Sequence, residues 1–177
     1  MWQILTILLS LTLLADTDTT RSVRQELVAG EEAPYFFAHL LDGEDFFLSR
    51  YVGPKARPAL QSPVVFAFFT TSCLPCRKEI PEIHKISREY PDISVFLINV
   101  GENRDFVKSF IKTRGYTLPV LLDPYRKISK KYLASVTPTL VTITSAGKID
   151  LYKRGYKETD NELIKQAFER LSGTLKN

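Results

Sequence analysis

The amino-acid sequence predicts an α/β fold: a central mixed sheet flanked by helices, with an N-terminal β-hairpin extension. Two observations carry this prediction. Apolar strand-like runs alternate with helical segments through the middle of the chain, and this alternation is typical of parallel strands joined by helices. Hairpin patterns at residues 35–48 and 139–153 flank the alternation, and hairpins join antiparallel strands. The expected order is therefore a hairpin followed by βαβαβαββα.

The first half of the chain is predicted to hold the hairpin, two buried strands and two helices. The hairpin consists of residues 35–41 and 44–48, joined at Asp42-Gly43, which is a strong turn signal. The elements that follow are a strand at 64–69, a helix at 76–90, a strand at 93–100 and a helix at 103–114. The strand at 64–69 is continuously apolar, as expected for a strand covered on both faces of a sheet, and the strand at 93–100 is also predicted to be buried.

The second half is predicted to continue with shorter elements. They are a strand at 118–122, a short helix at 124–133, strands at 139–144 and 149–153, and a helix at 160–171. The β-branched residues of 139–144 favour a strand, and a turn at 145–148 returns the chain as its antiparallel partner. The last helix is amphipathic, so its apolar face should pack against the sheet.

The N-terminal residues differ from the rest of the chain. Residues 2–15 carry no charge and are almost entirely apolar, but about 20 apolar residues are needed to span a bilayer. The run therefore matches the core of a signal peptide or signal anchor at 1–15. A polar linker at 16–29 and one domain at 30–177 follow. This division predicts a protein in the periplasm or on the outer face of the cytoplasmic membrane, either secreted or tethered through residues 2–15.

The composition is that of an ordinary globular domain. The 177 residues are 44% hydrophobic and 25% charged, which is enough for a normal core. The formal net charge of +4 is spread along the chain without a long basic run, and this weak pattern does not favour nucleic-acid binding. No feature of the sequence demands more than a monomer.

The only two cysteines, Cys73 and Cys76, form a CxxC motif between the strand at 64–69 and the following helix. At a helix N-terminus, unpaired backbone N–H groups and the helix dipole favour an anion. A Cys73 thiolate there should have a lowered pKa and act as a nucleophile. Cys76, one turn further on, is placed to attack any mixed disulfide that Cys73 forms. A disulfide across so short a loop constrains little unfolded chain, so we interpret the pair as redox chemistry.

A zinc site is another interpretation of a CxxC motif. Zinc needs more protein ligands than two sulfurs, and the histidines available are His39 and His84. His39 lies on the first predicted strand and His84 two turns along the helix after Cys76, so neither has metal-ligand spacing. We therefore predict surface or edge positions for both histidines, and no metal or other cofactor.

Further residues carry a resemblance to a known family. They are an Ala-Pro-x-Phe motif at 33–36, the block from Phe68 to Pro81 around the cysteines, and Thr137-Pro138 directly before a strand. Over roughly residues 30–172 the chain resembles the thioredoxin superfamily, specifically the exported TlpA/ResA-like thiol–disulfide oxidoreductases. The resemblance implies a thioredoxin-like fold for the domain.

The resemblance also assigns roles to residues. It implies that Cys73 and Cys76 are catalytic and form a redox-active disulfide. The Thr137-Pro138 bond should be cis, which is rare enough to need a reason, and should lie beside the nucleophilic sulfur. The backbone of Thr137 is then free to pair with an extended substrate segment. The expected substrate-binding residues are Thr137, Pro138, Leu74 and Pro75.

The sequence departs from the family pattern around the sulfurs. Ser72 takes the place of the usual tryptophan before the first cysteine, and Ala67 that of the buried acid of thioredoxins. Without that acid, proton transfer at Cys76 must use water or another group. Lys78 and Glu79 in the first helical turn are predicted to lie mainly on a solvated face. These departures affect the reduction potential and the choice of partner, not the type of reaction.

We therefore predict an exported thiol–disulfide oxidoreductase that acts as a disulfide reductase rather than an oxidase. Reduced Cys73 attacks a substrate disulfide, and Cys76 resolves the mixed disulfide. The partners implied are exported proteins with disulfides and a membrane thiol electron donor that reduces the pair again. By the resemblance alone, an apocytochrome c is one candidate substrate, which would place the protein in cytochrome c maturation.

Two other functions stay open. A peroxiredoxin-like (AhpC/TSA-type) peroxidase needs a threonine or serine three residues before its cysteine, where Thr70 fits, and a proline seven before, where Phe66 stands. A non-catalytic, membrane-tethered thioredoxin-like binding module is the other. The intact set of Cys73, Cys76 and Thr137-Pro138 argues against a module without catalysis.

Overall fold

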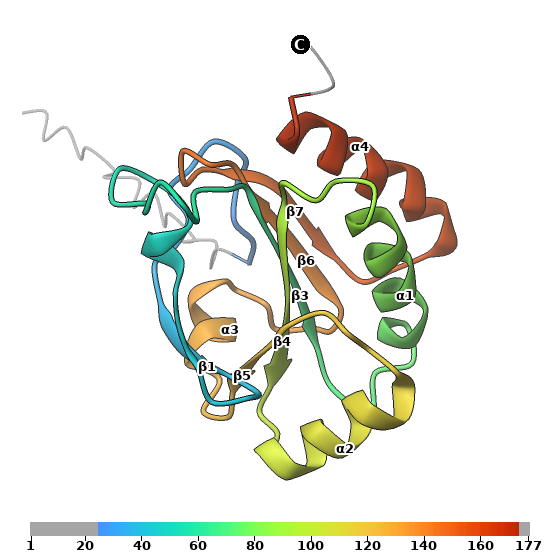
Figure 1. Ribbon diagram of the computed structural model, residues 1–177. Coiled ribbons are helices and arrows are strands. Elements are labelled where there is room, and N and C mark those ends of the chain that lie inside the picture. Colours follow the sequence, from blue (N-terminus) through green and yellow to red (C-terminus); the bar gives the residue numbers. More distant parts are fainter. Residues whose placement is uncertain (1–24, 174–177) are drawn as a thin grey trace, which may run out of the picture.

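A mixed sheet forms the centre of the computed structural model, which describes residues 25–173 (Figure 1). Its strands are β1 Phe37–Leu40, β2 Asp45–Phe47, β3 Val64–Phe69, β4 Ser94–Val100, β5 Val120–Asp123, β6 Thr139–Ile143 and β7 Ile149–Arg154. They lie in the spatial order β2-β1-β5-β4-β3-β6-β7. Along the chain, the order of strands and helices confirms the predicted hairpin and the series that follows it.

The central strands are parallel and the outer ones antiparallel. β3 pairs with β4 in parallel, and β4 pairs with β5 in the same way. β6 runs antiparallel to both β3 and β7, and β1 runs antiparallel to both β2 and β5. Each hairpin therefore extends one side of a parallel centre, which confirms the predicted mixed sheet.

Helices cover both faces of this sheet in the described part of the chain. They are α1 Cys76–Ser87, α2 Arg104–Arg114, α3 Lys127–Lys131 and α4 Asn161–Leu171, with short 3₁₀ helices at Leu48–Arg50 and Glu158–Asp160. α1 and α4 lie side by side on one face, and α3 lies on the other (Figure 1). The side chain of Asn103 caps α2 by accepting the N–H of Phe106.

Two helices are shorter than the sequence predicted. α1 ends before Tyr90 because the N–H groups of Glu89 and Tyr90 bond to carbonyls three residues back, as in a 3₁₀ turn. α3 is limited to five residues. Arg126 and Leu133 bound it with left-handed backbone, at φ 56° and 53°, a conformation that a right-handed helix cannot continue through.

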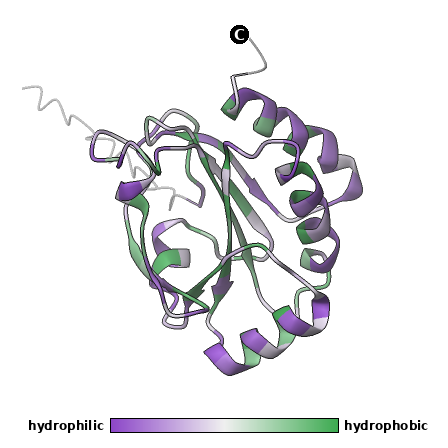
Figure 2. Ribbon diagram, in the orientation of Figure 1, coloured by the Kyte–Doolittle hydropathy of each residue, from purple (hydrophilic) through white to green (hydrophobic). Residues whose placement is uncertain are grey.

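The core consists of two layers, one on each face of the sheet. β3 is buried at every position, and alternate side chains of a strand point to opposite faces. Phe66 packs with Tyr132 next to α3, whereas Phe69 belongs to the layer that includes Ile80 of α1. Figure 2 shows the result as hydrophobic strands between helices whose outer surfaces are hydrophilic.

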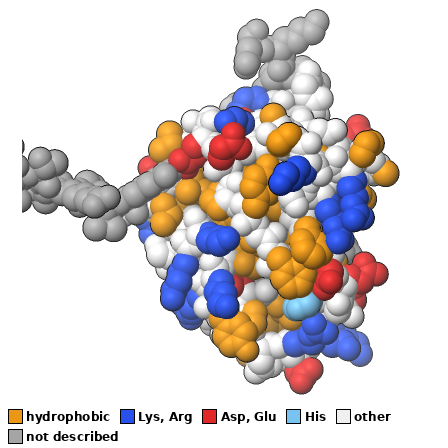
Figure 3. Space-filling model, turned by 90° about the vertical axis from the view of Figure 1, so that its left-hand side faces the viewer, with side chains coloured by type: hydrophobic (Ala, Val, Ile, Leu, Met, Phe, Trp, Pro, Cys, Tyr) orange, Lys and Arg blue, Asp and Glu red, His pale blue; other side chains and the backbone are white. Residues whose placement is uncertain are grey.

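The N-terminal hairpin has an exposed outer face. Phe37 is 46% exposed and lies against Phe47. The guanidinium carbon of Arg50 lies 4.1 Å from the centre of the Phe47 ring. His39 is exposed and contacts Asp45 at 3.0 Å, which confirms its predicted surface position. Figure 3 shows this side of the molecule, where hydrophobic side chains are interspersed with charged ones.

The predicted leader at 1–15 lies outside the described residues, as does most of the linker predicted at 16–29. Leu27, at the end of that linker range, is buried against the domain core. The division at residue 30 stays a prediction. None of the helices within residues 25–173 combines the length and the apolar character that a membrane span needs.

Candidate active site

The residues predicted for the site meet at one edge of the sheet. The turn that holds the cysteines leaves the carboxyl end of β3, and Glu102 follows the carboxyl end of the parallel strand β4. β6 runs antiparallel to β3, so Thr137-Pro138 at its start reaches the same edge. Loops at the carboxyl ends of parallel strands are the usual location of α/β binding sites.

The two cysteines differ in exposure and in contacts. A disulfide joins them, with their Cα atoms 5.3 Å apart. Cys73 keeps 8% of its surface accessible, whereas Cys76 keeps 1%. The N–H of Cys76 donates a hydrogen bond to the Cys73 sulfur at 3.1 Å, and among the described residues 25–173 no side chain caps the start of α1. The Cys73 sulfur thus occupies the anion position at the start of α1, where a thiolate is stabilised.

Thr70 connects the cysteine turn with the loop before β6. Its carbonyl accepts the N–H of Cys73 at 3.2 Å, and its hydroxyl lies 3.5 Å from that of Thr137. The Thr137-Pro138 bond is cis, as the resemblance implied. The structure therefore brings Thr137 and Pro138 to the cysteine turn.

The predicted substrate-binding residues differ in accessibility. Pro138 is buried and Thr137 half-buried, whereas Leu74 is 68% exposed and Pro75 is also exposed. Leu74 and Pro75 therefore present an apolar surface between the sulfurs. Their contact with a substrate stays a prediction. His84 is not part of this edge: it lies further along α1 and contacts the Thr117 hydroxyl at 2.9 Å.

Glu102 stabilises the cysteine turn, and the sequence patterns did not predict this residue. Its carboxylate accepts the N–H of Thr71 at 2.9 Å and the Thr71 hydroxyl at 2.7 Å. The side-chain amide of Asn99 donates to the same carboxylate at 2.5 Å. Arg77 donates to the carbonyl of Thr71 at 3.0 Å from the other side. Charge-assisted hydrogen bonds of this kind are about twice as strong as neutral ones, so the turn is held rigidly.

The predicted solvated position of Glu79 is wrong. Glu79 is fully buried, and Lys78 beside it is exposed. The reason is helical periodicity: Cys76, Glu79 and Ile83 fall on the buried face of α1. The spacing of these residues was visible in the sequence and was the signal that could have placed Glu79 inside.

Burial changes the acidity of Glu79. Removal from water disfavours its charge and raises its pKa from 4.5 to about 7, although the ammonium of Lys153 opposes the rise. The Lys153 Nζ lies 3.6 Å from the Glu79 carboxylate, close enough for an ion pair but too far for a hydrogen bond. Both Glu79 oxygens are buried without a hydrogen-bond partner. Lys153 also contacts Asp160 at 3.0 Å.

Glu79 lies one helical turn after Cys76, on the same buried face of α1. Residues three apart on a helix have Cβ atoms roughly 5–6 Å apart, and helical side chains lean toward the N-terminus. The Glu79 side chain therefore lies next to Cys76, the sulfur for which the sequence offered no proton acceptor. The site thus has a nucleophile position, a buried second sulfur and a carboxyl group that titrates near neutral pH.

Comparisons with known proteins agree with this geometry. A model of the AhpC/TSA family matches residues 29–152. Thiol-disulfide oxidoreductase ResA of Bacillus subtilis strain 168 is 29% identical over 128 residues, which is 71% of this chain and 67% of ResA. Sporulation thiol-disulfide oxidoreductase A of the same strain is 27% identical over 125 residues, 68% of this chain and 70% of that relative.

Solved structures confirm the predicted thioredoxin-like fold. A crystal structure described as a thiol:disulfide interchange protein, DsbE, of Chlorobium tepidum has a TM-score of 0.74 and 24% identity. The match covers 84% of this chain and 100% of the Chlorobium tepidum chain. The family match at 29–152 includes both cysteines and Thr137-Pro138.

Proposed function

The chain belongs to the AhpC/TSA family and is a thiol–disulfide oxidoreductase, and we propose that it reduces disulfides of exported proteins. One observation supports the proposal above all others. The Cys73 sulfur accepts the N–H at the start of α1 while Cys76 is buried behind it. That asymmetry suits a nucleophile and a resolving thiol.

The proposed reaction has two exchange steps. The Cys73 thiolate attacks one sulfur of the substrate disulfide, that bond breaks, and the substrate's other sulfur leaves as a thiolate that takes up a proton. Cys76 then attacks the Cys73 sulfur, releases the second substrate thiol and closes the Cys73–Cys76 bond. Two electrons have moved from the protein to the substrate. A membrane thiol carrier returns them by the reverse exchange.

Glu79 is proposed as the group that takes the proton from Cys76. With a pKa of about 7, its carboxyl is present in both forms near neutral pH, and this is the best range for a general acid–base group. If this role holds, Glu79→Gln should slow release of the substrate from the mixed disulfide much more than its formation. Stopped-flow measurement of both steps between pH 6 and about 8 tests it. Equal slowing of both would contradict it.

Export is proposed from the sequence alone. The uncharged apolar run at 2–15 is the feature that supports it, and it also supports a membrane tether. A substrate such as an apocytochrome c is a finer proposal that rests only on the family resemblance of the sequence. Labelling of the cysteines in intact cells by a membrane-impermeant maleimide tests the location. Labelling that requires lysis would contradict export.

A peroxidase is the second candidate function, because the family match carries the AhpC/TSA name and Thr70 occupies the expected position. Phe66 in place of the proline and Cys76 only three residues away argue against it. Peroxide consumption that survives Cys76→Ser would favour the peroxidase.

The decisive experiment follows the two sulfurs in the full chain. Reduced wild type should reduce insulin disulfides, Cys73→Ser should be inactive, and Cys76→Ser should accumulate a mixed disulfide with the substrate. Ser72→Ala, which keeps both sulfurs, is the matched control and should remain active. Equal rates for wild type and both cysteine variants would overturn the assignment.

The direction of electron flow needs a separate measurement. Equilibration with glutathione buffers should give a reduction potential near that of thioredoxin, roughly −270 mV. A value near that of the oxidant DsbA, roughly −120 mV, would contradict the reductase direction and leave the exchange chemistry intact.

A further inference from the structure

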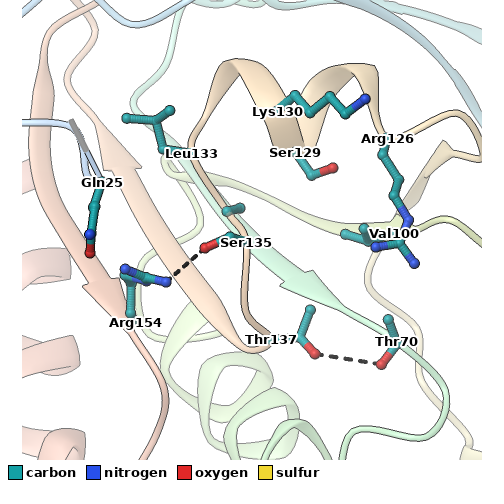
Figure 4. A pocket seen from close by; sticks show the side chains of 11 residues that line it. Gln25, Thr70, Val100, Arg126, Ser129, Lys130, Leu133, Ser135, Thr137 and Arg154 are labelled. Atoms are coloured by element: carbon teal, nitrogen blue, oxygen red, sulfur yellow. Dashed lines mark hydrogen bonds between the residues drawn. The ribbon is translucent and has the colours of Figure 1, made fainter. Parts of the chain in front are cut away.

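A pocket of about 530 Å³ lies beside the cysteine turn, on the face of the sheet that carries α3 (Figure 4). Its volume is in the usual range for ligand sites. Its lining comes from α3, the ends of β4 and β7, and the loop before β6. The lining residues are Gln25, Thr70, Val100, Arg126, Ser129, Lys130, Leu133, Ala134, Ser135, Thr137 and Arg154.

One end of the pocket is part of the candidate active site. Thr70 and Thr137 lie there with their hydroxyls facing each other at 3.5 Å (Figure 4). The carbonyl of Thr70 accepts the N–H of Cys73. An occupant of the pocket that reaches Thr137 therefore stands next to the segment that presents the reactive sulfur.

The pocket is positively charged. Arg126, Lys130 and Arg154 line it, and no acidic side chain among residues 25–173 does. Within residues 25–173, none of the three forms an ion pair with an aspartate or glutamate. Asp123, which precedes α3, is buried and accepts the N–H groups of Ile128 and Ser129. Its carboxylate is therefore hydrogen-bonded inside the protein and does not line the pocket.

The side chain of Arg154 has a free donor at this pocket. Its terminal nitrogen donates to the Ser135 hydroxyl at 2.7 Å, but its Nε is buried and has no hydrogen-bond partner. A buried charged donor without an acceptor is costly, and Arg154 lines the pocket, where a carboxylate would pair with the charge of its guanidinium. On the opposite side of the pocket (Figure 4), the guanidinium of Arg126 packs against Gly101, whose added Cβ would lie 2.7 Å from Nε.

We propose that this pocket binds an acidic side chain of the substrate protein, located close in sequence to the disulfide that Cys73 attacks. The inference rests on the proposed function and deepens it by naming a feature of the substrate. Guanidinium groups hydrogen-bond carboxylates in pairs, and the hydroxyls of Thr70, Thr137 and Ser135 add donors. A segment that is bonded to Cys73 and runs past Thr137 has this pocket directly beside it.

Matched peptides test the inference. Each contains one disulfide, and members of a pair differ only by Glu or Gln at one position flanking a cysteine. With the full chain, kcat/KM should be roughly fivefold higher for Glu at one position, as expected for one partly exposed ion pair. The preference should shrink as salt concentration rises. Equal kcat/KM for every Glu and Gln pair would overturn the inference.

Variants locate the effect. Arg126→Gln combined with Lys130→Gln should remove the preference for Glu. The control Arg88→Gln combined with Lys112→Gln removes the same charge outside the pocket and should keep it. Arg154→Gln alone should also reduce the preference. If the control variant loses as much of the preference for Glu as the pocket variant does, the preference arises from net charge and the inference is wrong.

A neutral substrate separates the two proposals. Hydroxyethyl disulfide carries no charge, so wild type and all pocket variants should reduce it at the same rate, which also shows that they are folded. Reduction of the Gln peptides without a preference for Glu would overturn the pocket and leave the proposed function intact. Failure of wild type to reduce any of these disulfides would overturn both.

Discussion

Lys153 and Arg154 are neighbours on β7, yet their side chains serve opposite faces of the sheet. Lys153 lies 3.6 Å from the buried Glu79 of α1, whereas Arg154 lines the basic pocket beside α3. The period of two in a strand causes this separation. One cation is paired inside the protein and the other keeps a free donor. Adjacent positive charges on one strand can therefore have different surroundings, one beside a buried carboxyl group and one at a pocket.

The largest expected effect comes from removing Lys153. Lys153→Met should lower the free energy of unfolding at pH 8 by about 4 kcal/mol, because it leaves the Glu79 carboxylate buried without a cation. At pH 5 the loss should be much smaller, since Glu79 is then protonated. Urea unfolding at both pH values measures this. Arg154→Met is the matched control and should cost about 1 kcal/mol at either pH. Equal losses at the two pH values would mean that Lys153 matters through packing.

An intermediate effect is expected from Glu79 itself. Its pKa is about 7 in the folded protein and 4.5 in the reference state, so the folded state binds more protons between these values. Stability should therefore fall as pH rises from 4.5 to 7, by up to about 3 kcal/mol from this group. Glu79→Gln should remove that fall.

The measurement is the difference in unfolding free energy between wild type and Glu79→Gln at several pH values. The unfolding free energy of the variant should rise relative to that of wild type as pH increases from 4.5 to 7. Below pH 4.5 the difference between the two proteins should stay constant. A constant difference across the window would show that Glu79 has an ordinary pKa. Glu82→Gln, on the same helix, is the control for loss of a carboxylate.

The smallest expected effect comes from Gly101, which has a φ of 77° and lies against Arg126. Gly101→Ala should cost about 1 kcal/mol of stability because of its left-handed backbone. It should also displace Arg126 and weaken the preference for Glu peptides, although no charge is removed. Gly115→Ala has a similar φ and no neighbour within 4 Å, so it should cost as much stability and leave the preference unchanged. If both variants lost the preference for Glu peptides, the result would show that Arg126 is not involved in substrate binding.

Much of the fold could be predicted from local patterns. The continuous apolar run at Val64–Phe69 and the turn signal Asp42-Gly43 were enough to place β3 and the first hairpin. The bounds of α3 were not predictable in this way. Arg126 and Leu133 adopt left-handed backbone, and neither residue type signals that conformation.

The candidate site divides in the same manner. Cys73 and Cys76 were found because their spacing and neighbours are local features, and Thr137-Pro138 through the family resemblance. Glu102 was missed because its partner Thr71 lies 31 residues away. Its role depends on two strand ends meeting at one edge, which no local pattern encodes.

The thiol chemistry of this protein is visible in the amino-acid sequence: two sulfurs lie at a strand-to-helix junction, with the helix N-terminus to stabilise one of them. These features follow from residues close together in the chain. The surroundings of the sulfurs, in contrast, depend on how distant segments pack in the folded domain. The buried Glu79 meets a cation because β7 brings Lys153 beside it, and Arg154 reached the pocket because strand pairing places β7 next to β6. Burial and charge pairing depend on contacts between distant segments, and those exist only once the sheet has formed.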